Sequence, residues 1–305
     1  MKYAKVLMLV PLVAILVTGC IKEDDEADIR DLLLSSWYIG DGAVQVADDS
    51  TNTPGSFSGL SVLADTFPPE VRWVRYIQRP VSWSLDIVVT EDSADVTIYT
   101  YFEGEPPGYG FFVINELYGP VYQRAITDSV VRRVKCYKDE DGWHLASFTV
   151  ADIYTIGTEH PVTITEVRAE VASRNYEFVV NSPDTHFEKD SLPIFYPSDT
   201  VEVTVTCSAQ DDSTWAFLHH GAGHRPGVGL RPHHRDPFYR ENTTTFIRTW
   251  IIADDSVITT PAVRHSAVDV LGWQTLFGDS TATYYARAWA LPYIVMQPGE
   301  EIPED

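Results

Sequence analysis

Short strand-like runs recur through most of this chain and restrict it to a fold built mainly from β-strands. The runs are rich in Val, Ile, Tyr, Phe and Trp, and turn residues such as Gly, Pro, Asp and Ser separate them. They cover residues 81–89, 94–102, 110–114, 122–137, 143–154, 162–171, 176–180, 200–207, 214–219, 243–252, 262–270 and 282–296. The sequence therefore predicts a mostly β protein.

The spacing of the runs divides the chain into two predicted domains. About 285 residues remain after an N-terminal leader, and one domain commonly holds about 100 to 200 residues. A plausible joint lies at 155–161, between the two groups of runs. We expect a first domain at 28–155 and a second at 162–297, followed by an acidic, Pro-rich tail at 298–305.

The first predicted domain opens with a helix. Ile29, Leu32, Leu33 and Trp37 are spaced as on one helix face, acidic residues precede them, and Gly40 follows as a stop. The next stretch is rich in Gly, Ser, Thr, Asp and Pro and predicts a long loop with room for one helical turn. About five strands then complete the domain.

The last hairpin of this domain carries a resemblance to a known fold. Residues 132–145 read Arg-Arg-Val-Lys-Cys-Tyr-Lys-Asp-Glu-Asp-Gly-Trp-His-Leu, which is a charged strand, an Asp-Gly turn and a strand beginning with Trp143. With the early helix, this pattern resembles the nuclear-transport-factor-two-like fold, which includes polyketide-cyclase-like and ketosteroid-isomerase-like proteins. The resemblance implies a cone-like α+β domain with a curved antiparallel sheet and a pocket. Some members use that pocket for acid–base catalysis and many use it for binding alone.

Seven short strands in roughly 135 residues indicate that the second domain is an immunoglobulin-like β-sandwich. The Cys…Trp…Cys pattern of true immunoglobulin domains is missing, so the prediction concerns the architecture only. In the run 201–207 the odd positions are apolar, which places Cys207 on a buried face. We expect Cys136 and Cys207 to act as small buried hydrophobes and not to form a disulfide.

The N-terminus has the pattern of an export signal. Lys2 and Lys5 precede a short apolar run, which ends in Val-Thr-Gly-Cys at residues 17–20. This end resembles the bacterial lipobox, in which a peptidase cuts before the cysteine and lipid is attached to it. Residues 1–19 are then a signal peptide, and 20–27 are the lipidated Cys20 and an acidic tether. An ordinary signal peptide with an incidental cysteine is the alternative.

The resemblance to lipoproteins also suggests a location. Ile21, not aspartate, follows the cysteine, so the inner-membrane retention signal of enterobacterial lipoproteins is missing. We expect a cell-envelope protein in the outer membrane, facing the periplasm or the surface. The formal net charge of −22 would repel phosphate backbones, which argues against a nucleic-acid partner.

Two side chains of the first domain are candidate catalytic bases. Asp86 is an acid within the apolar run 81–89, and in an apolar pocket its pKa would rise. A solvent-facing or edge-strand position is the interpretation we favour for it. His144 is the second candidate. Arg132 and Arg133 could clamp an anion, although pairing with acids across the sheet fits them better.

A histidine-rich segment lies in the second domain. Five of the nine histidines fall within 16 positions, among several Gly and Pro residues. They are His219, His220, His224, His233 and His234. Such tracts are typical of Zn, Ni or Cu sites, but no His-Glu-x-x-His motif accompanies them. An exposed loop without metal is the alternative that we favour.

These observations predict a lipid-anchored binding or scaffold module with no cofactor. Its expected partners are the membrane, through the lipid, and an envelope protein or a small ligand. Motifs for nucleophilic catalysis and for phosphate binding are missing from the sequence. The alternatives are a pocket enzyme or small-ligand binder, and a divalent transition-metal protein that uses the histidine-rich segment.

Overall fold

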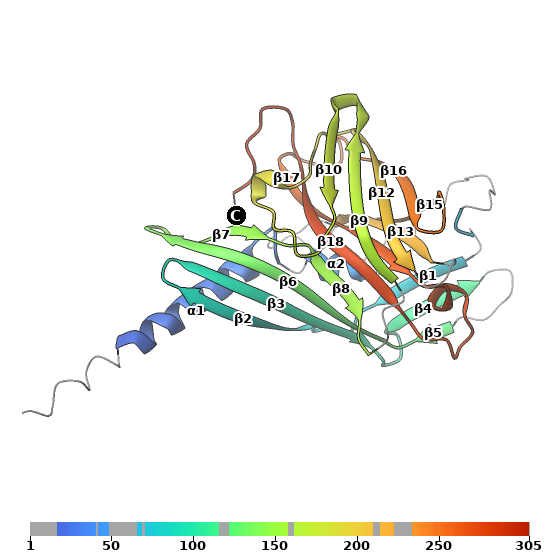
Figure 1. Ribbon diagram of the computed structural model, residues 1–305, viewed down its shortest axis with the longest axis horizontal. Helices are drawn as coiled ribbons and strands as arrows, with labels where there is room; N and C mark the ends of the chain where they lie inside the picture. The colour runs from blue at the N-terminus through green and yellow to red at the C-terminus, as the bar shows by residue number, and fades with distance from the viewer. Residues whose placement is uncertain are drawn as a thin grey trace, which may run out of the picture.

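The structure is a computed structural model, which describes residues 17–40, 42–48, 66–68, 71–115, 122–157, 162–209, 214–222 and 234–304. Within these residues the chain is mostly β, with three sheets and a helix near the N-terminus (Figure 1). The mostly β fold class that the strand runs predict is therefore confirmed.

The largest sheet has ten strands and takes them from both halves of the chain. They are β2 (Ser82–Thr90), β3 (Ser93–Gly104), β6 (Ile126–Asp139), β7 (Gly142–Phe148), β8 (Ala151–Thr155), β11 (Ile194–Phe195), β13 (Trp215–Ala222), β14 (His234–Pro237), β17 (Ala262–Leu271) and β18 (Ala286–Val295). Antiparallel pairing of β8 with β18 joins the two halves, with Tyr154 opposite Arg287 and Ala151 opposite Ala290. The two predicted domain ranges therefore share one hydrogen-bonded sheet.

A five-stranded antiparallel sheet packs on the C-terminal half of the ten-stranded sheet. Across this sheet the strands are β10 (Tyr176–Val180), β9 (Val162–Val171), β12 (Thr200–Ala209), β16 (Thr245–Ile251) and β15 (Tyr239–Arg240). Figure 1 shows β9, β10 and β12 standing over β17 and β18. Val201, Val203, Val205 and Cys207 of β12 are all buried, as the alternation in this strand predicts. The layering is β-sandwich-like.

The opposite face of the ten-stranded sheet carries a smaller sheet and short helices. These elements are β1 (Val71–Tyr76), β4 (Gly110–Asn115), β5 (Tyr122–Arg124), α2 (Gly42–Ala47) and α3 (Trp273–Phe277). The Trp73 ring lies 5.2 Å from that of Phe111 and 4.9 Å from that of Phe217. Strand β13 thus directs Phe217 to this layer and Leu218 to the five-stranded sheet, because successive side chains of a strand alternate.

Helix α1 (Val17–Ser35) packs against β2 and β7 at the N-terminal end of the large sheet. Its Ile29 and Leu33 are buried in the main core, as the helical spacing predicts. The carboxylate of Asp25 accepts hydrogen bonds from Lys138 Nζ (2.5 Å) and Trp143 Nε1 (3.0 Å), so the helix is tied to the β6–β7 hairpin. The helix begins at Val17, before residue 28, where the first predicted domain starts. Among the described helices, none has the length and apolar character needed to cross a membrane.

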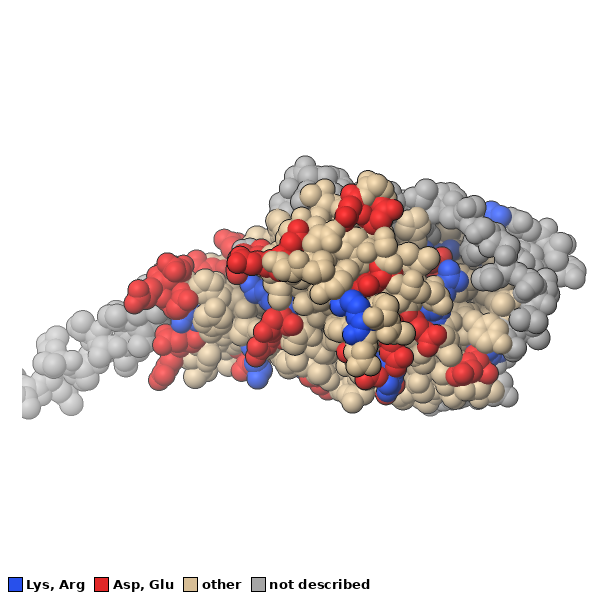
Figure 2. All heavy atoms as spheres, turned by 90° about the horizontal axis from the view of Figure 1, so that it is seen from above, with Lys and Arg blue, Asp and Glu red and all other residues tan. Residues whose placement is uncertain are grey.

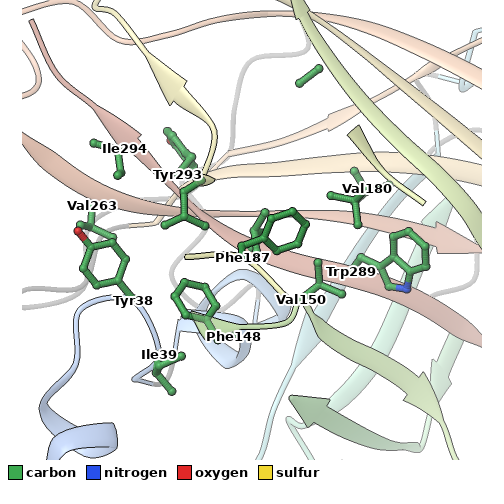
Figure 3. Close-up of a cluster of buried hydrophobic side chains, with 14 of the residues drawn as sticks. Tyr38, Ile39, Phe148, Val150, Val180, Phe187, Val263, Trp289, Tyr293 and Ile294 are labelled. Carbon is green, nitrogen blue, oxygen red and sulfur yellow. The ribbon is translucent and has the colours of Figure 1, made fainter. Parts of the chain in front are cut away.

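The main core is continuous between the two predicted domain ranges (Figure 3). The rings of Tyr38 and Phe148 lie 6.3 Å apart, and Val263 and Tyr293 from the C-terminal half belong to the same cluster. Two 3-10 turns, η2 (Ala172–Arg174) and η3 (Lys189–Ser191), lie in the connections around it. Cys136 and Cys207 are buried and not disulfide-bonded, which confirms their predicted role as small apolar side chains.

Candidate functional site

One face of the β2–β3–β6 part of the large sheet is open to solvent and carries exposed aromatic rings. Tyr99 and Tyr101 of β3 are 44% and 39% exposed, and Tyr137 of β6 is 45% exposed. Monomeric proteins seldom expose several large rings together unless the surface binds something. We call this surface the tyrosine face; it comprises Ser84, Asp86, Val88, Asp95, Tyr99, Tyr101, Arg133, Lys135 and Tyr137.

The alternation of β3 explains why these rings point outward. Ala94, Val96 and Phe102 are buried on the side covered by the core, so Tyr99 and Tyr101 stand on the other side. In the register, Ser84 of β2 lies opposite Tyr99. A one-residue slip would bury the tyrosines and expose the valines, so the buried face fixes the orientation of the tyrosine face.

The tyrosine face carries charges of both signs. Asp95 lies opposite Lys135 in the register, and Arg133 forms an ion pair with Asp184. The sequence favours pairing of Arg133 with an acid across the sheet, but Asp184 lies in a turn outside the strands and Thr97 is opposite Arg133 in the register. In the view of Figure 2, acidic side chains form several patches, one of them beside the described part of α1. On the tyrosine face, the acids Asp86 and Asp95 are matched by the bases Arg133 and Lys135.

Strand β2 forms one end of the strand order in the large sheet. Its outer edge presents backbone N–H and C=O groups that a further strand could pair with. Asp86 is exposed in the middle of this strand, as the favoured interpretation from the sequence has it. The charged side chain in the middle of β2 also disfavours uncontrolled pairing of edges between copies.

The second candidate base, His144, lies on β7. Its Nε2 is 2.8 Å from Asp139 Oδ1, and its ring stacks on that of Tyr137 with 5.1 Å between centroids. The backbone N–H of Asp141 and then His144 hold the pKa of the Asp139 carboxyl below its usual value. These contacts brace the turn of the hairpin, and the structure does not bring His144 and Asp86 into a common pocket among the described residues.

Arg132 and Arg133 point to opposite faces of β6. The buried guanidinium of Arg132 donates to the backbone oxygens of Ile39 (3.2 Å) and Ala290 (3.3 Å). Its burial lowers its pKa to about 10. Arg132 therefore ties the segment after α1 to strand β18 and is not free to clamp an anion.

The histidine-rich segment is divided between the two faces of a hairpin. His219 is buried, with its Nε2 3.3 Å from Asp269 Oδ2, whereas His220 Nε2 lies 3.1 Å from Asp236 Oδ2 on the other face. His234, opposite His220 in the register, stacks on it. His224 and His233 lie outside the described residues. In the part of the chain that the structure describes, no three His, Cys, Asp or Glu side chains gather as a metal site would require.

A buried network of charged and polar side chains lies between β1 and the large sheet. Arg75 Nη2 is 2.8 Å from Asp269 Oδ2, and Asp128 accepts hydrogen bonds from Thr155 Oγ1 (2.8 Å) and Tyr284 Oη (3.0 Å). None of these five side chains is more than 5% exposed. A soluble substrate does not reach them, so the network acts as a structural joint between the layers.

For each of the two buried carboxyls, Asp128 and Asp269, burial acts to raise the pKa and the positive charge of Arg75 acts to lower it. Burial raises the pKa of Asp128 to about 6, although Arg75 and the hydrogen bonds from Thr155 and Tyr284 oppose the rise. Burial also acts to raise the pKa of Asp269, but Arg75 and His219 outweigh it and hold that pKa below its usual value. The sequence signal that could have identified Asp269 is an acid inside an apolar run, Ala267-Val268-Asp269-Val270.

Comparison of the chain with known protein families, with curated proteins and with solved structures gives no match. The resemblances to the nuclear-transport-factor-two-like fold, to the immunoglobulin-like fold and to lipoproteins therefore stay predictions from the sequence.

Proposed function

We propose that this chain is a membrane-tethered, non-catalytic binding module that binds a protein partner of the cell envelope through its tyrosine face. The observation that carries the proposal is the exposure of Tyr99 and Tyr101, side by side on an open sheet face. Tyrosine and arginine are enriched in protein interfaces, where an aromatic ring contributes contact area and its hydroxyl contributes a hydrogen bond.

The surroundings of the two rings favour binding over catalysis. The candidate bases Asp86 and His144 lie on different strands, Asp86 is exposed, and neither side chain lines the apolar pocket between the two sheets. The opposite charges of Asp95 and Lys135, which face each other in the register further along the same sheet face, fit the polar rim of an interface. The free edge of β2 offers the partner an additional strand-pairing surface.

The tether is the lipid on Cys20, which the lipobox-like sequence supports. Helix α1 leads from this residue to the side of the β2–β3–β6 sheet opposite the tyrosine face. With the lipid in the outer membrane, the tyrosine face would stay available to a partner in the periplasm or at the surface. A Cys20→Ser variant should move the protein from the membrane fraction to the soluble fraction of the source cells.

Site-specific photo-crosslinking in the source cells tests the interface. A photoreactive phenylalanine at position 99 or 101 should give one discrete crosslinked species of higher mass. The matched control is Tyr239, which is 41% exposed on β15 of the five-stranded sheet and should give no such species. The double variant Tyr99→Ser/Tyr101→Ser should lose the partner in co-purification, whereas Tyr239→Ser should retain it. Equal crosslinking from positions 99 and 239, or none from 99 and 101, would contradict the proposal.

A further inference from the structure

Among the strands that the structure describes, β2 has the longest edge without a partner strand. Its 9 residues pair only with β3, in an antiparallel register without a bulge. Every other strand at an end of the strand order has six residues or fewer. Figure 1 shows β2 as the outermost strand of the large sheet, beside α1. Proteins usually shorten, bulge or cover such an edge, so the edge of β2 is a feature to explain.

The side of β2 that faces α1 is apolar and only partly covered. Leu85, Ile87 and Val89 pack against the main core on this side but remain half-buried. On the neighbouring strand β3, Val96 lies opposite Ile87 and Ala94 lies opposite Val89, yet they are only 1% and 2% exposed. The core is therefore incompletely covered at β2, and the apolar side chains of one more strand would remove this surface from water.

The other side of β2 carries a single charged side chain. Asp86 is exposed in the middle of the strand, and Ser84 and Val88 flank it on the same side. Residues directly opposite each other on a sheet face interact, so a lysine or arginine facing Asp86 is favoured and an acid is disfavoured.

This charge also disfavours a second copy of the chain as the occupant of the edge. Two β2 strands could pair in antiparallel fashion and keep their apolar sides together. The registers that overlap most of both strands would then bring the two Asp86 carboxylates opposite or diagonal to each other. A different segment, with the complementary charge, fits the edge better.

We propose that the β2 edge binds an extended segment of the protein partner as an added strand, and that this segment carries a lysine or arginine opposite Asp86 between two apolar residues. The inference rests on the proposed function for the partner being a protein, and it adds the form and chemistry of the bound segment. The backbone groups of the edge provide hydrogen bonds, as in other cases of strand addition. The two apolar residues cover Leu85 and Ile87, while the basic residue lies beside the tyrosine face.

Three end-capped peptides with the length of β2 test the added strand. The first is Thr-Val-Thr-Val-Lys-Val-Thr-Val-Thr, the second has Glu in place of Lys, and the third has Pro in place of the two Val beside Lys. In residue-resolved hydrogen exchange of the full chain, the Lys peptide should protect amides of β2 and leave those of β10 unchanged. We expect it to bind about fivefold more tightly than the Glu peptide at low salt. The Pro peptide should give no protection, because proline breaks the hydrogen-bonded ladder.

Two charge reversals complete the test. Asp86→Lys should reverse the preference, so that the Glu peptide binds more tightly than the Lys peptide. Glu177→Lys is the matched control, because Glu177 is an exposed acid in the middle of β10, the edge strand of the five-stranded sheet, and this variant should retain the original preference. In the unaltered chain, equal binding of the Lys and Glu peptides, protection by the Pro peptide, or no protection of β2 would overturn the proposal.

These outcomes are separable from those of the proposed function. Crosslinks from positions 99 and 101 without protection of β2 by the Lys peptide would keep the tyrosine face as an interface and overturn the added strand. Protection of β2 without such crosslinks would support the added strand and contradict the role of the tyrosine face.

Discussion

At the scale of single residues, the structure buries an ion pair and a second carboxylate together in the core. Arg75 stacks near the rings of Trp73 and Tyr284, at 5.6 and 5.7 Å from their centroids, and pairs with Asp269. A second carboxylate, Asp128, lies in the same network. One arginine thus faces two buried acids, and Asp128, the acid without a close ion pair, has the raised pKa.

Replacing Asp128 by Asn should remove one contribution to the pH dependence of stability. Because burial raises the pKa of Asp128 from 3.8 to about 6, the folded state binds this proton more tightly than the unfolded state. Protonated Asp128 therefore stabilises the folded state by up to about 3 kcal/mol below about pH 4. This stabilisation is lost as the pH rises through 6. Urea unfolding, followed by tryptophan fluorescence, should show that the free energy of unfolding of Asp128→Asn rises relative to that of the unaltered chain between pH 4.5 and pH 7.

Asp86→Asn is the matched control for this measurement, because Asp86 is exposed on β2. It should leave the free energy of unfolding within about 0.5 kcal/mol at both pH values. If Asp128→Asn had the same pH dependence as the unaltered chain, the buried carboxyl would not be the group that titrates.

At the scale of elements, the contact between α1 and the β6–β7 hairpin depends on one carboxylate. Asp25 accepts hydrogen bonds from Lys138 and Trp143, and these two contacts lower its pKa. The ionised Asp25 carboxylate therefore stabilises the folded state at pH values above the ordinary pKa of an aspartate. This stabilisation is lost as the pH falls through the lowered pKa of Asp25.

Asp25→Ala should loosen α1 without unfolding the sheets. Hydrogen bonds to a charged group contribute about 1.5 to 3 kcal/mol, and removal of Asp25 also leaves the buried indole N–H of Trp143 without its acceptor. Hydrogen exchange should become faster in α1, while the amides of β12 and β18 keep their protection. Asp31→Ala, an exposed position on the same helix, should leave exchange in α1 unchanged. Equal exchange in both variants would show that Asp25 does not hold the helix.

At the scale of the whole molecule, the β8–β18 pairing makes the two predicted domain ranges mutually dependent. The ten-stranded sheet and the main core both continue across this pairing. Residues 28–157 alone would leave the β8 edge unpaired and the apolar side chains around it exposed. We expect this fragment to aggregate, whereas the full chain should unfold in one transition.

Urea unfolding of the full chain, observed by far-ultraviolet circular dichroism and by tryptophan fluorescence, checks this expectation. The two signals should change together, as cooperative unfolding requires. Two separated transitions, or a soluble fragment that unfolds cooperatively, would instead show that residues 28–155 fold as an independent domain.

The sequence alone determined the features that depend on neighbouring residues. Alternation of apolar and polar residues predicted the strands and the buried position of Cys207, helical spacing predicted that Ile29 and Leu33 are buried, and the Asp-Gly turn predicted the hairpin before Trp143. These signals are local, because they follow from side-chain direction and turn geometry within a few residues.

Only the tertiary structure decided which strands pair across long stretches of the chain. Tyr154 lies opposite Arg287 and Arg75 meets Asp269 because distant segments share a sheet or a layer. The apolar pocket lined by Leu218, Trp250 and Trp289 lies where the two sheets meet. Contacts of this kind depend on the shape and volume of whole layers, and a single sequence does not state which distant residues will fill that volume.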